Sequence, residues 1–381
     1  MKIFYYMPFK PPGHKNPSGD LIIGVELLQF LKKKGVDIRV VSRFRCRWIY
    51  LKPHLWPLLI IEIWRVLRLC KKERPDIWLT YHSYYKAPDI LGSLCCRILG
   101  IPYGIFQGIY STKRRKVLKS RLGFYLNRLA LQSASVVYTN KKADYVNLIR
   151  LLPEEKVMYI APGLHPEDFR FEAAAREVIR QKLQVGDRVV VMTAAMFRPG
   201  VKTEGIFNVI ESCRLLRDKG WDILLLIAGD GIKREEIECY AQDMLGDAAV
   251  LLGRIPRHTL KKYYSAADIF AFPGIEESLG MVFLEAQACS LPVVAFREWG
   301  AREAVLENKT GFLCSAKEAR LFSHYLAKLA GDGALRRKMG EAGQQHIALH
   351  HDIKINYSHL YRHLKKIAGE TGKGRTVARR S

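Results

Sequence analysis

Short apolar runs alternate with amphipathic stretches along the first half of the chain. The runs lie at 2–7, 36–41, 75–80, 101–108, 135–140 and 156–160. Between the first two, Leu21, Val25, Leu28 and Leu31 keep the spacing of one helix face. Continuous apolar runs of this length are typical of parallel strands that are covered on both faces. The alternation therefore predicts a doubly wound α/β sheet of about six strands.

The same alternation returns in the second half, with apolar runs at 189–193, 222–228, 250–252, 267–273 and 292–295. The last two runs enclose a Gly-bearing turn and a helical stretch with two carboxylates, Glu277 in the turn and Glu285 in the helix. Ligands of open α/β sheets bind at the carboxyl ends of the strands, and free N–H groups at a helix start favour anions. We therefore expect a binding site at this turn.

The segment that carries the two glutamates resembles a known family. It reads A-D-I-F-A-F-P, then E-S-L-G-M-V-F-L-E, then L-P-V-V-A, and this resembles the E-x7-E region of family 4 retaining glycosyltransferases. The resemblance implies the GT-B fold, in which two Rossmann-like doubly wound parallel-sheet domains face a central cleft. The stretch from Ala161 to Phe169 is similar to the family's linker. It implies a first domain over 1–165, a second over 175–350, and a C-terminal helix over 351–381 with an unstructured basic tail from Gly369.

The resemblance also implies which residues bind the sugar donor. Arg198 and Lys202 match the family's cations on the donor diphosphate, and Glu277 matches the carboxylate on the donor sugar. These three are the expected catalytic residues. Binding roles fall to Glu285 on the ribose, to the N–H groups of Leu279, Gly280 and Met281 on the diphosphate, and to the main chain of Arg254 and Ile255 on the base. The resemblance implies no metal ion and no cofactor beside the nucleotide-sugar donor.

Two positions of the first half complete the expected site. Gly19, after Ser18 and before a helix, matches a Gly-rich turn of the family that contacts donor or acceptor, although an ordinary helix cap explains it equally well. Gln107 stands where relatives commonly have a histidine beside the donor sugar. Glutamine can hydrogen-bond a sugar hydroxyl but cannot titrate. His82 ends a predicted strand and is either a substrate contact or a loop residue without a role.

Charge narrows the classes of partner. The chain has a net charge of +25, and residues 1–160 contribute 29 Lys and Arg against 10 Asp and Glu, a difference of +19. Without a recognisable nucleic-acid module, we expect an anionic membrane surface or anionic substrate rather than nucleic acid. Trp56, Leu58 and Leu59 before Arg65 and Arg68 are typical of an interfacial helix, although a helix packed on its own sheet is the alternative.

The expected function follows from the resemblance and the charge together. We expect a retaining, metal-independent hexosyltransferase that moves a sugar from a nucleotide-diphosphate sugar to an envelope glycan, lipopolysaccharide or lipid-linked acceptor. The eight scattered Cys and the strand that begins at Lys2 favour a cytoplasmic protein, peripheral on the inner membrane face. The alternatives are a transferase for a small soluble acceptor and a non-catalytic scaffold that binds glycan or membrane.

Overall fold

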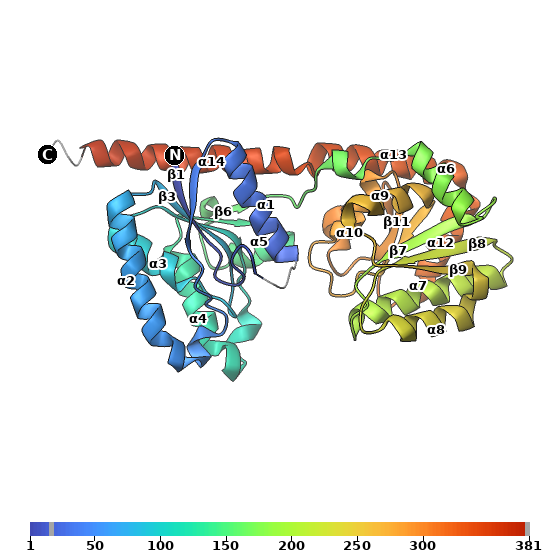
Figure 1. Cartoon of the computed structure of the whole chain (residues 1–381), viewed down its shortest axis with the longest axis horizontal. Coiled ribbons are helices and arrows are strands. Elements are labelled where there is room, and N and C mark those ends of the chain that lie inside the picture. The colour runs from blue at the N-terminus through green and yellow to red at the C-terminus, as the bar shows by residue number, and fades with distance from the viewer. Residues whose placement is uncertain (15–18, 378–381) are drawn as a thin grey trace. The chain divides into compact units, whose positions relative to one another are not determined.

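The structure, a computed structural model, describes residues 1–14 and 19–377 (Figure 1). The chain divides into two compact units. Unit 1 comprises Met1–Ala161 and the segment from Lys354 onward, and unit 2 comprises Pro162–Ile353. The chain therefore passes from one unit to the other twice, after Ala161 and after Ile353.

Unit 1 is built on a six-stranded parallel sheet in the order β2-β1-β3-β4-β5-β6. The apolar runs of the first half form these strands, which confirms the predicted doubly wound sheet. The strands are β1 (Lys2–Tyr6), β2 (Asp37–Ser42), β3 (Ile77–Ser83), β4 (Tyr103–Gly108), β5 (Val136–Thr139) and β6 (Val157–Tyr159). The helices are α1 (Gly19–Lys33), α2 (Trp56–Glu73), α3 (Ile90–Leu99), α4 (Leu118–Ser133), α5 (Lys142–Leu148) and α14 (Ile353–Val377).

Two groups of helices cover the two faces of this sheet (Figure 1). On one face, buried side chains of α2, α3 and α4 form a core with the strands, as Val66, Cys95 and Leu131 show. On the other face, Tyr357 of α14 packs edge-to-face on Phe106 of β4 and on Phe30 of α1. Tyr138 of β5 shares a hydrogen bond of 2.7 Å with Nδ1 of His363. The end of the chain is thus part of unit 1, and Leu360 and Leu364 are fully buried there.

Helix α14 is longer than the sequence analysis predicted. The expected unstructured tail from Gly369 is helical as far as Val377, because no proline interrupts residues 353–377. Residues 378–381 lie outside the described part of the chain, as does Ser18, the proposed cap of α1.

Unit 2 repeats the architecture with a parallel sheet in the order β12-β11-β10-β7-β8-β9. Its strands are β7 (Val189–Ala194), β8 (Ile223–Ala228), β9 (Ala249–Gly253), β10 (Ile269–Ala271), β11 (Val293–Phe296) and β12 (Gly311–Cys314). Its helices are α6 (Ala173–Lys182), α7 (Val201–Asp218), α8 (Arg234–Leu245), α9 (Arg257–Ala266), α10 (Met281–Ala288), α11 (Ala301–Ala304), α12 (Ala319–Gly331) and α13 (Gly333–His350).

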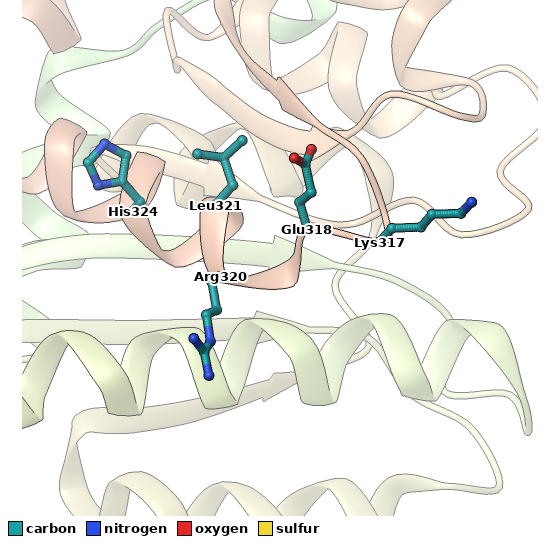
Figure 2. A pocket seen from close by; sticks show the side chains of 5 residues that line it. All are labelled: Lys317, Glu318, Arg320, Leu321 and His324. Atoms are coloured by element: carbon teal, nitrogen blue, oxygen red, sulfur yellow. The ribbon is translucent and has the colours of Figure 1, made fainter.

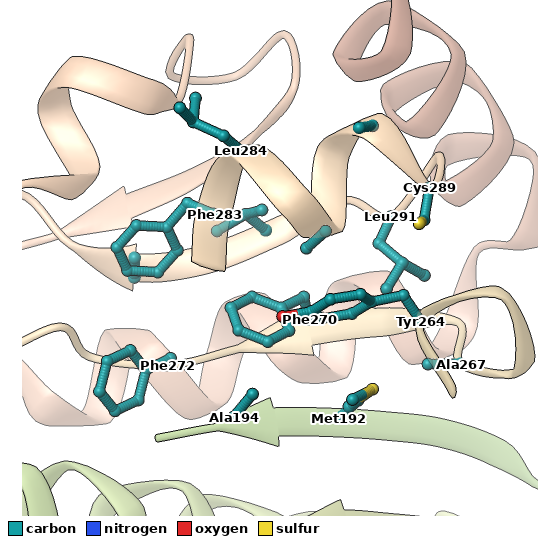
Figure 3. Close-up of a cluster of buried hydrophobic side chains, with 14 of the residues drawn as sticks. Met192, Ala194, Tyr264, Ala267, Phe270, Phe272, Phe283, Leu284, Cys289 and Leu291 are labelled. Atoms are coloured by element: carbon teal, nitrogen blue, oxygen red, sulfur yellow. The ribbon is translucent and has the colours of Figure 1, made fainter. Parts of the chain in front are cut away.

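The sheet of unit 2 is also covered on both faces. Helices α7, α8 and α12 bury their apolar residues on one face. On the other face, Phe283 of α10 and Tyr264 of α9 pack edge-to-face on Phe270 of β10, as Figure 3 shows, and Leu284 is buried in the same core. Every residue of α10 from Phe283 to Ala288 is buried, so the position of this helix is fixed by the core. This packing also fixes the loop that leads into it.

Candidate functional site

The order of strands in unit 2 reverses between β7 and β10, which lie side by side. At such a point the connections leave to opposite sides of the sheet, and a binding site opens at the carboxyl ends of the strands. The loop after β7 leads to α7, and the loop after β10 leads to α10. Lys202 stands on the first of these connections and Glu277 on the second.

Lys202 and Glu277, two of the predicted catalytic residues, form an ion pair between Nζ and Oε2. Lys202 lies in the first turn of α7, and its Nζ also lies 5.4 Å from the centre of the Phe272 ring. Both side chains are half-buried, with about a fifth to a quarter of their surface exposed. A cation and a carboxylate therefore stand together at the switch point, within reach of a ligand.

Backbone hydrogen bonds decide which of two neighbouring glutamates faces Lys202. The Glu277 N–H donates to the Gly274 carbonyl at 2.9 Å, and the Glu277 carbonyl accepts from the Gly300 N–H at 2.9 Å. Glu276 adopts a left-handed φ of 53° and is exposed. The tight turn thus directs Glu276 outward and Glu277 to Lys202.

The start of α10 follows this turn directly, at Leu279, Gly280 and Met281. Gly280 has a φ of 65°, and a β-carbon there would lie 2.6 Å from the Phe283 ring and 2.9 Å from the Gly300 carbonyl oxygen. Glycine is therefore required at this position by backbone conformation and by space. The first N–H groups of a helix have no partner within it and carry its positive dipole end, so this turn can bind an anion.

Glu285, the second glutamate, lies one turn into α10 and is only 5% exposed. Its Oε1 accepts from Nε of Arg257 at 2.9 Å, and its Oε2 accepts from the Tyr264 hydroxyl at 3.4 Å. Burial raises the pKa of this carboxyl, and the Arg257 cation opposes the shift. A carboxylate has about four acceptor positions, so Glu285 can still accept hydroxyl groups.

Sequence reasoning missed Arg257 and Tyr264 as partners of Glu285. Arg257 is the first residue of α9 and lies three positions after Arg254, in the segment already assigned to the base. Its position beside Pro256 at a helix start was the available signal. Tyr264 gave none, because a buried tyrosine in an amphipathic helix reads as core.

The remaining predicted donor residues lie on neighbouring loops at the same edge of the sheet. The Phe197 N–H donates to the Asp230 carbonyl at 3.1 Å, and the Gly229 N–H donates to the Gly253 carbonyl at 2.9 Å. These bonds join the loops after β7, β8 and β9. Arg198 and Arg254 are exposed on them, whereas Ile255 packs against the core.

The predicted residues of unit 1 lie where its own strand order reverses, between β1 and β3. Gly19 begins α1 in the described chain, and Oδ1 of the next residue, Asp20, lies 3.7 Å from Nδ1 of His82 at the end of β3. Burial lowers the pKa of His82, while Asp20 opposes the shift. Gln107 ends β4, and its Nε2 donates to Asn140 Oδ1 at 3.0 Å.

Two features of His82 and Gln107 are unusual for strand ends. Their φ angles are 66° and 61°, in the left-handed region. Both are buried, and among the described residues the Gln107 Oε1 has no hydrogen-bond partner. Strained backbone and unpaired buried polar atoms concentrate at binding sites. The sequence pointed to His82 by its position and to Gln107 by the family resemblance, and it contained no signal for their backbone conformation.

A surface pocket of about 580 Å³ lies away from all of these residues, at the start of α12. Figure 2 shows its lining side chains spread along the helix, with Arg320 pointing away from Glu318. Because these side chains do not converge, the pocket offers no organised set of ligand contacts. None of the predicted site residues lines it.

Residues 176–346 match the family model of glycosyl transferases group 1. The match lies wholly within unit 2 and includes Lys202, Glu277, Arg257 and Glu285.

Two curated relatives extend this comparison. Over 200 residues, 50% of this chain and 52% of the relative, the chain is 32% identical to a GDP-mannose-dependent alpha-(1-6)-phosphatidylinositol monomannoside mannosyltransferase of Mycolicibacterium smegmatis. It therefore spans about half the length of that relative. The capsular polysaccharide biosynthesis glycosyltransferase CapM of Staphylococcus aureus is 23% identical over 346 residues, 84% of this chain and 87% of CapM.

The fold itself is shown by solved structures. Anabaena HepE in complex with UDP superimposes with a TM-score of 0.76 at 17% identity, over 96% of this chain and all of HepE. Together with the two six-stranded parallel sheets, this likeness establishes the predicted fold, GT-B with two Rossmann-like domains.

Proposed function

We propose that this protein is a retaining, metal-independent glycosyltransferase that moves a sugar from a nucleotide-diphosphate sugar to an envelope glycan, lipopolysaccharide or lipid-linked acceptor. The observation that carries the proposal is the Lys202–Glu277 pair at the switch point of unit 2, inside the segment that matches glycosyl transferases group 1. Relatives that transfer mannose or build capsule support the reaction class.

In the proposed reaction an acceptor hydroxyl oxygen forms a bond to the sugar's anomeric carbon on the face from which the diphosphate leaves, and the hydroxyl proton passes to the leaving diphosphate. The bond from the anomeric carbon to the diphosphate oxygen breaks, and negative charge develops on the diphosphate. Lys202, the exposed Arg198 and the N–H groups at the start of α10 would stabilise this charge. Glu277 would accept hydrogen bonds from the sugar hydroxyls, and Glu285 from the ribose. The pairing of Lys202 with Glu277 keeps the cation and the sugar-binding carboxylate adjacent before the donor arrives.

Relatives do not agree on the nucleotide. The mycobacterial relative is named for GDP-mannose, and the HepE structure contains UDP. The proposed contacts to the base come from the main chain of Arg254 and Ile255, which does not distinguish bases by side-chain chemistry. We leave the base open and make it the first result of the test.

The test is a thermal-shift screen of the full chain with UDP-, GDP-, ADP- and TDP-sugars in the presence of a chelator. A donor at about a hundred times its Kd stabilises the native state by ~2.7 kcal/mol. We expect one base to raise the Tm, with the shift lost in Glu285→Gln. The absence of a shift with every donor would favour the non-catalytic scaffold. The donor found in the screen is then used in a transfer assay. Transfer to a soluble acceptor alone would favour the transferase for a small soluble acceptor, and a product with inverted anomeric configuration would contradict retention.

The proposed acceptor lies at an anionic membrane surface, and α2 supports this part of the proposal. Only Val66 and Cys70 of α2 are fully buried, whereas Ile60 and Trp64 are 66% and 55% exposed. The guanidinium of Arg68 lies 3.2 Å from the centre of the Trp64 ring. The helix therefore packs on its sheet by a narrow edge and also presents the apolar and basic side chains of an interfacial helix.

No helix within residues 1–14 and 19–377 combines the length and the apolar character that a membrane crossing requires. The proposed membrane contact runs along the surface of unit 1, through exposed side chains such as Trp56, Trp64 and Lys72.

A further inference from the structure

We propose that unit 1 holds a binding site for a phosphate or diphosphate group on the acceptor, formed by two aromatic rings and three cations. We name it the aromatic–cation patch, and it consists of Trp48, Tyr85, Lys86, Arg114 and Lys119. The proposal rests on the proposed function only in taking the bound anion as part of the acceptor. The anion site itself follows from the geometry of unit 1.

The aromatic base of the patch is held rigidly. The rings of Trp48 and Tyr85 meet edge-to-face with centroids 5.9 Å apart. The backbone N–H of Trp48 donates to the Lys86 carbonyl at 2.6 Å, and the Tyr50 hydroxyl donates to the Tyr85 carbonyl at 3.0 Å. Trp48 has a left-handed φ of 55°, an unfavourable conformation that these contacts maintain.

Helix α4 lies directly against this base. A β-carbon on Gly123 of α4 would lie 2.1 Å from the Tyr85 carbonyl oxygen, so the glycine permits the close approach. One turn earlier, the buried Ser120 hydroxyl donates to the Arg114 carbonyl at 2.9 Å and ties the 3₁₀ turn Thr112–Arg115 to the helix. Arg114 and Lys119 are thereby placed on the same two rings.

Three cations from three segments converge on these rings. The Arg114 guanidinium lies 4.6 Å from the centre of Tyr85 and the Lys119 Nζ 5.6 Å from that of Trp48. The Lys86 Nζ lies 5.6 Å from Tyr85 and 6.0 Å from Trp48. In the part of the chain that the structure describes, no ion pair joins any of the three to a carboxylate.

The charge balance of the patch indicates the class of ligand. Three positive charges over two neighbouring rings repel one another, and each ring face offsets only a small part of that repulsion. A phosphate or diphosphate brings two or more negative charges and several acceptor oxygens, so it can engage an arginine and two lysines at once. The ring faces beside it suit an apolar neighbour, such as a sugar face or a prenyl chain.

A row of aromatic rings leads from the patch toward the predicted site of unit 1. Tyr85 contacts Tyr84 edge-to-face at 5.6 Å, and Tyr84 stacks on His82 at 4.5 Å. Because β2, β3 and β4 are parallel, the segments after them share one edge of the sheet. An acceptor anchored by its anionic group at Arg114 and Lys119 would extend along Tyr84 toward His82.

The test compares two double variants with the same loss of charge in one short segment. Arg114→Ala/Lys119→Ala removes two patch cations, and Arg115→Ala/Lys116→Ala removes two exposed neighbours that contact no ring within residues 1–14 and 19–377. Binding of inorganic pyrophosphate is measured by calorimetry on the full chain. Co-sedimentation with phosphatidylcholine vesicles, with and without polyprenyl diphosphate, forms the second arm. Both variants keep Arg198 and Lys202, so pyrophosphate binding in unit 2 contributes equally.

We expect the Arg114→Ala/Lys119→Ala variant to bind about tenfold more weakly than the control pair, since hydrogen bonds to charged groups are lost. The loss of binding to free pyrophosphate indicates a soluble phosphorylated acceptor, and a loss confined to polyprenyl diphosphate vesicles indicates a lipid-linked one. Equal weakening in both variants, or none in the first, overturns the proposal.

Nucleotide-induced thermal shifts are measured in the same two variants. We expect both to keep the shift of the unchanged protein, because Lys202 and Glu285 are intact. If the protein binds pyrophosphate at the patch but binds no nucleotide, the proposed anion site is supported and the proposed function is contradicted. If it binds a nucleotide but no pyrophosphate at the patch, the proposed function is supported and the proposed anion site is contradicted.

Discussion

The candidate site of unit 2 and the aromatic–cation patch of unit 1 differ in what lies beside their cations. In unit 2 two cations of the site have a carboxylate partner, Lys202 with Glu277 and Arg257 with Glu285. In the patch, Arg114 and Lys119 lie over aromatic rings instead. The first arrangement offers both donors and acceptors to a sugar nucleotide. The second offers only positive charge, which suits an anion and tolerates variety in the rest of the ligand.

The same contrast extends over the sequence. Residues 1–160 have an excess of 19 positive charges and the remaining residues an excess of 6, from 33 Lys and Arg against 27 Asp and Glu. Exposed charges are screened by salt. Ligand binding at unit 1 should therefore weaken with ionic strength far more than nucleotide binding at unit 2.

The largest effect is expected from Lys202→Ala. Removal of a cation that stabilises the leaving diphosphate should lower turnover about 100-fold, as measured by steady-state transfer from the donor found in the screen. Lys219→Ala, at the opposite and exposed end of α7, is the matched control. Equal turnover in the two variants would contradict the assignment of Lys202.

Glu285→Gln should have the next largest effect and should act on binding. Loss of a charged acceptor for the ribose hydroxyls should weaken nucleotide binding about tenfold, with Kd measured by calorimetry. Glu276→Gln is the control, because Glu276 is exposed and faces away from Lys202. If both variants bind the nucleotide alike, Glu285 has no role at the ribose.

Lys72→Ala tests the proposed contact between α2 of unit 1 and an anionic membrane. One basic residue near an anionic bilayer contributes ~1 kcal/mol, so binding to phosphatidylglycerol vesicles should fall about fivefold. Lys338→Ala, an exposed lysine on α13, provides the control and should bind as the unchanged protein does. A reversed order of the two variants would place the membrane contact elsewhere.

The smallest effect is a dependence of stability on pH. Burial raises the pKa of Glu285 above the unfolded value near 4.5, although Arg257 opposes the shift. Above that pH the native state keeps a proton that the unfolded chain has released, so the free energy of unfolding falls as pH rises. In the Glu285→Gln variant this position cannot titrate, so it contributes no pH dependence to the free energy of unfolding.

The Tm of the unchanged protein should therefore drop relative to Glu285→Gln as the pH rises from about 4 to about 7, as followed by calorimetry. Glu276→Gln serves again as control, and its Tm should run parallel to that of the unchanged protein. If the Tm of the unchanged protein instead rises relative to that of Glu285→Gln as the pH rises, the effect of Arg257 on the pKa of Glu285 outweighs that of burial.

Much of the fold was predictable, because it depends on patterns that are local in the sequence. The apolar runs around Phe270 and Val294 specify buried parallel strands, and the turn between them specifies where a ligand can bind. The partners of Glu285 were not predictable, since Arg257 and Tyr264 reach it only through the packing of α9 on α10. The patch was less predictable still. Trp48, Tyr85 and Lys119 come from three distant segments, which meet only through tertiary contacts such as the Trp48–Lys86 backbone hydrogen bond and the approach of Gly123 to Tyr85.

The double passage of the chain between the units sets an order for folding during synthesis. Unit 2 is one continuous segment, Pro162–Ile353, and can fold once that segment has left the ribosome. Unit 1 contains the first strand, yet one face of its sheet is covered by Tyr357, Leu360 and Leu364. The part of the face under these side chains stays uncovered until residues 357–364 have been translated, after all of unit 2. Unit 1 can therefore complete its sheet only after unit 2 has been translated, and a nascent chain that stops before α14 would leave part of that sheet exposed to aggregation and proteolysis.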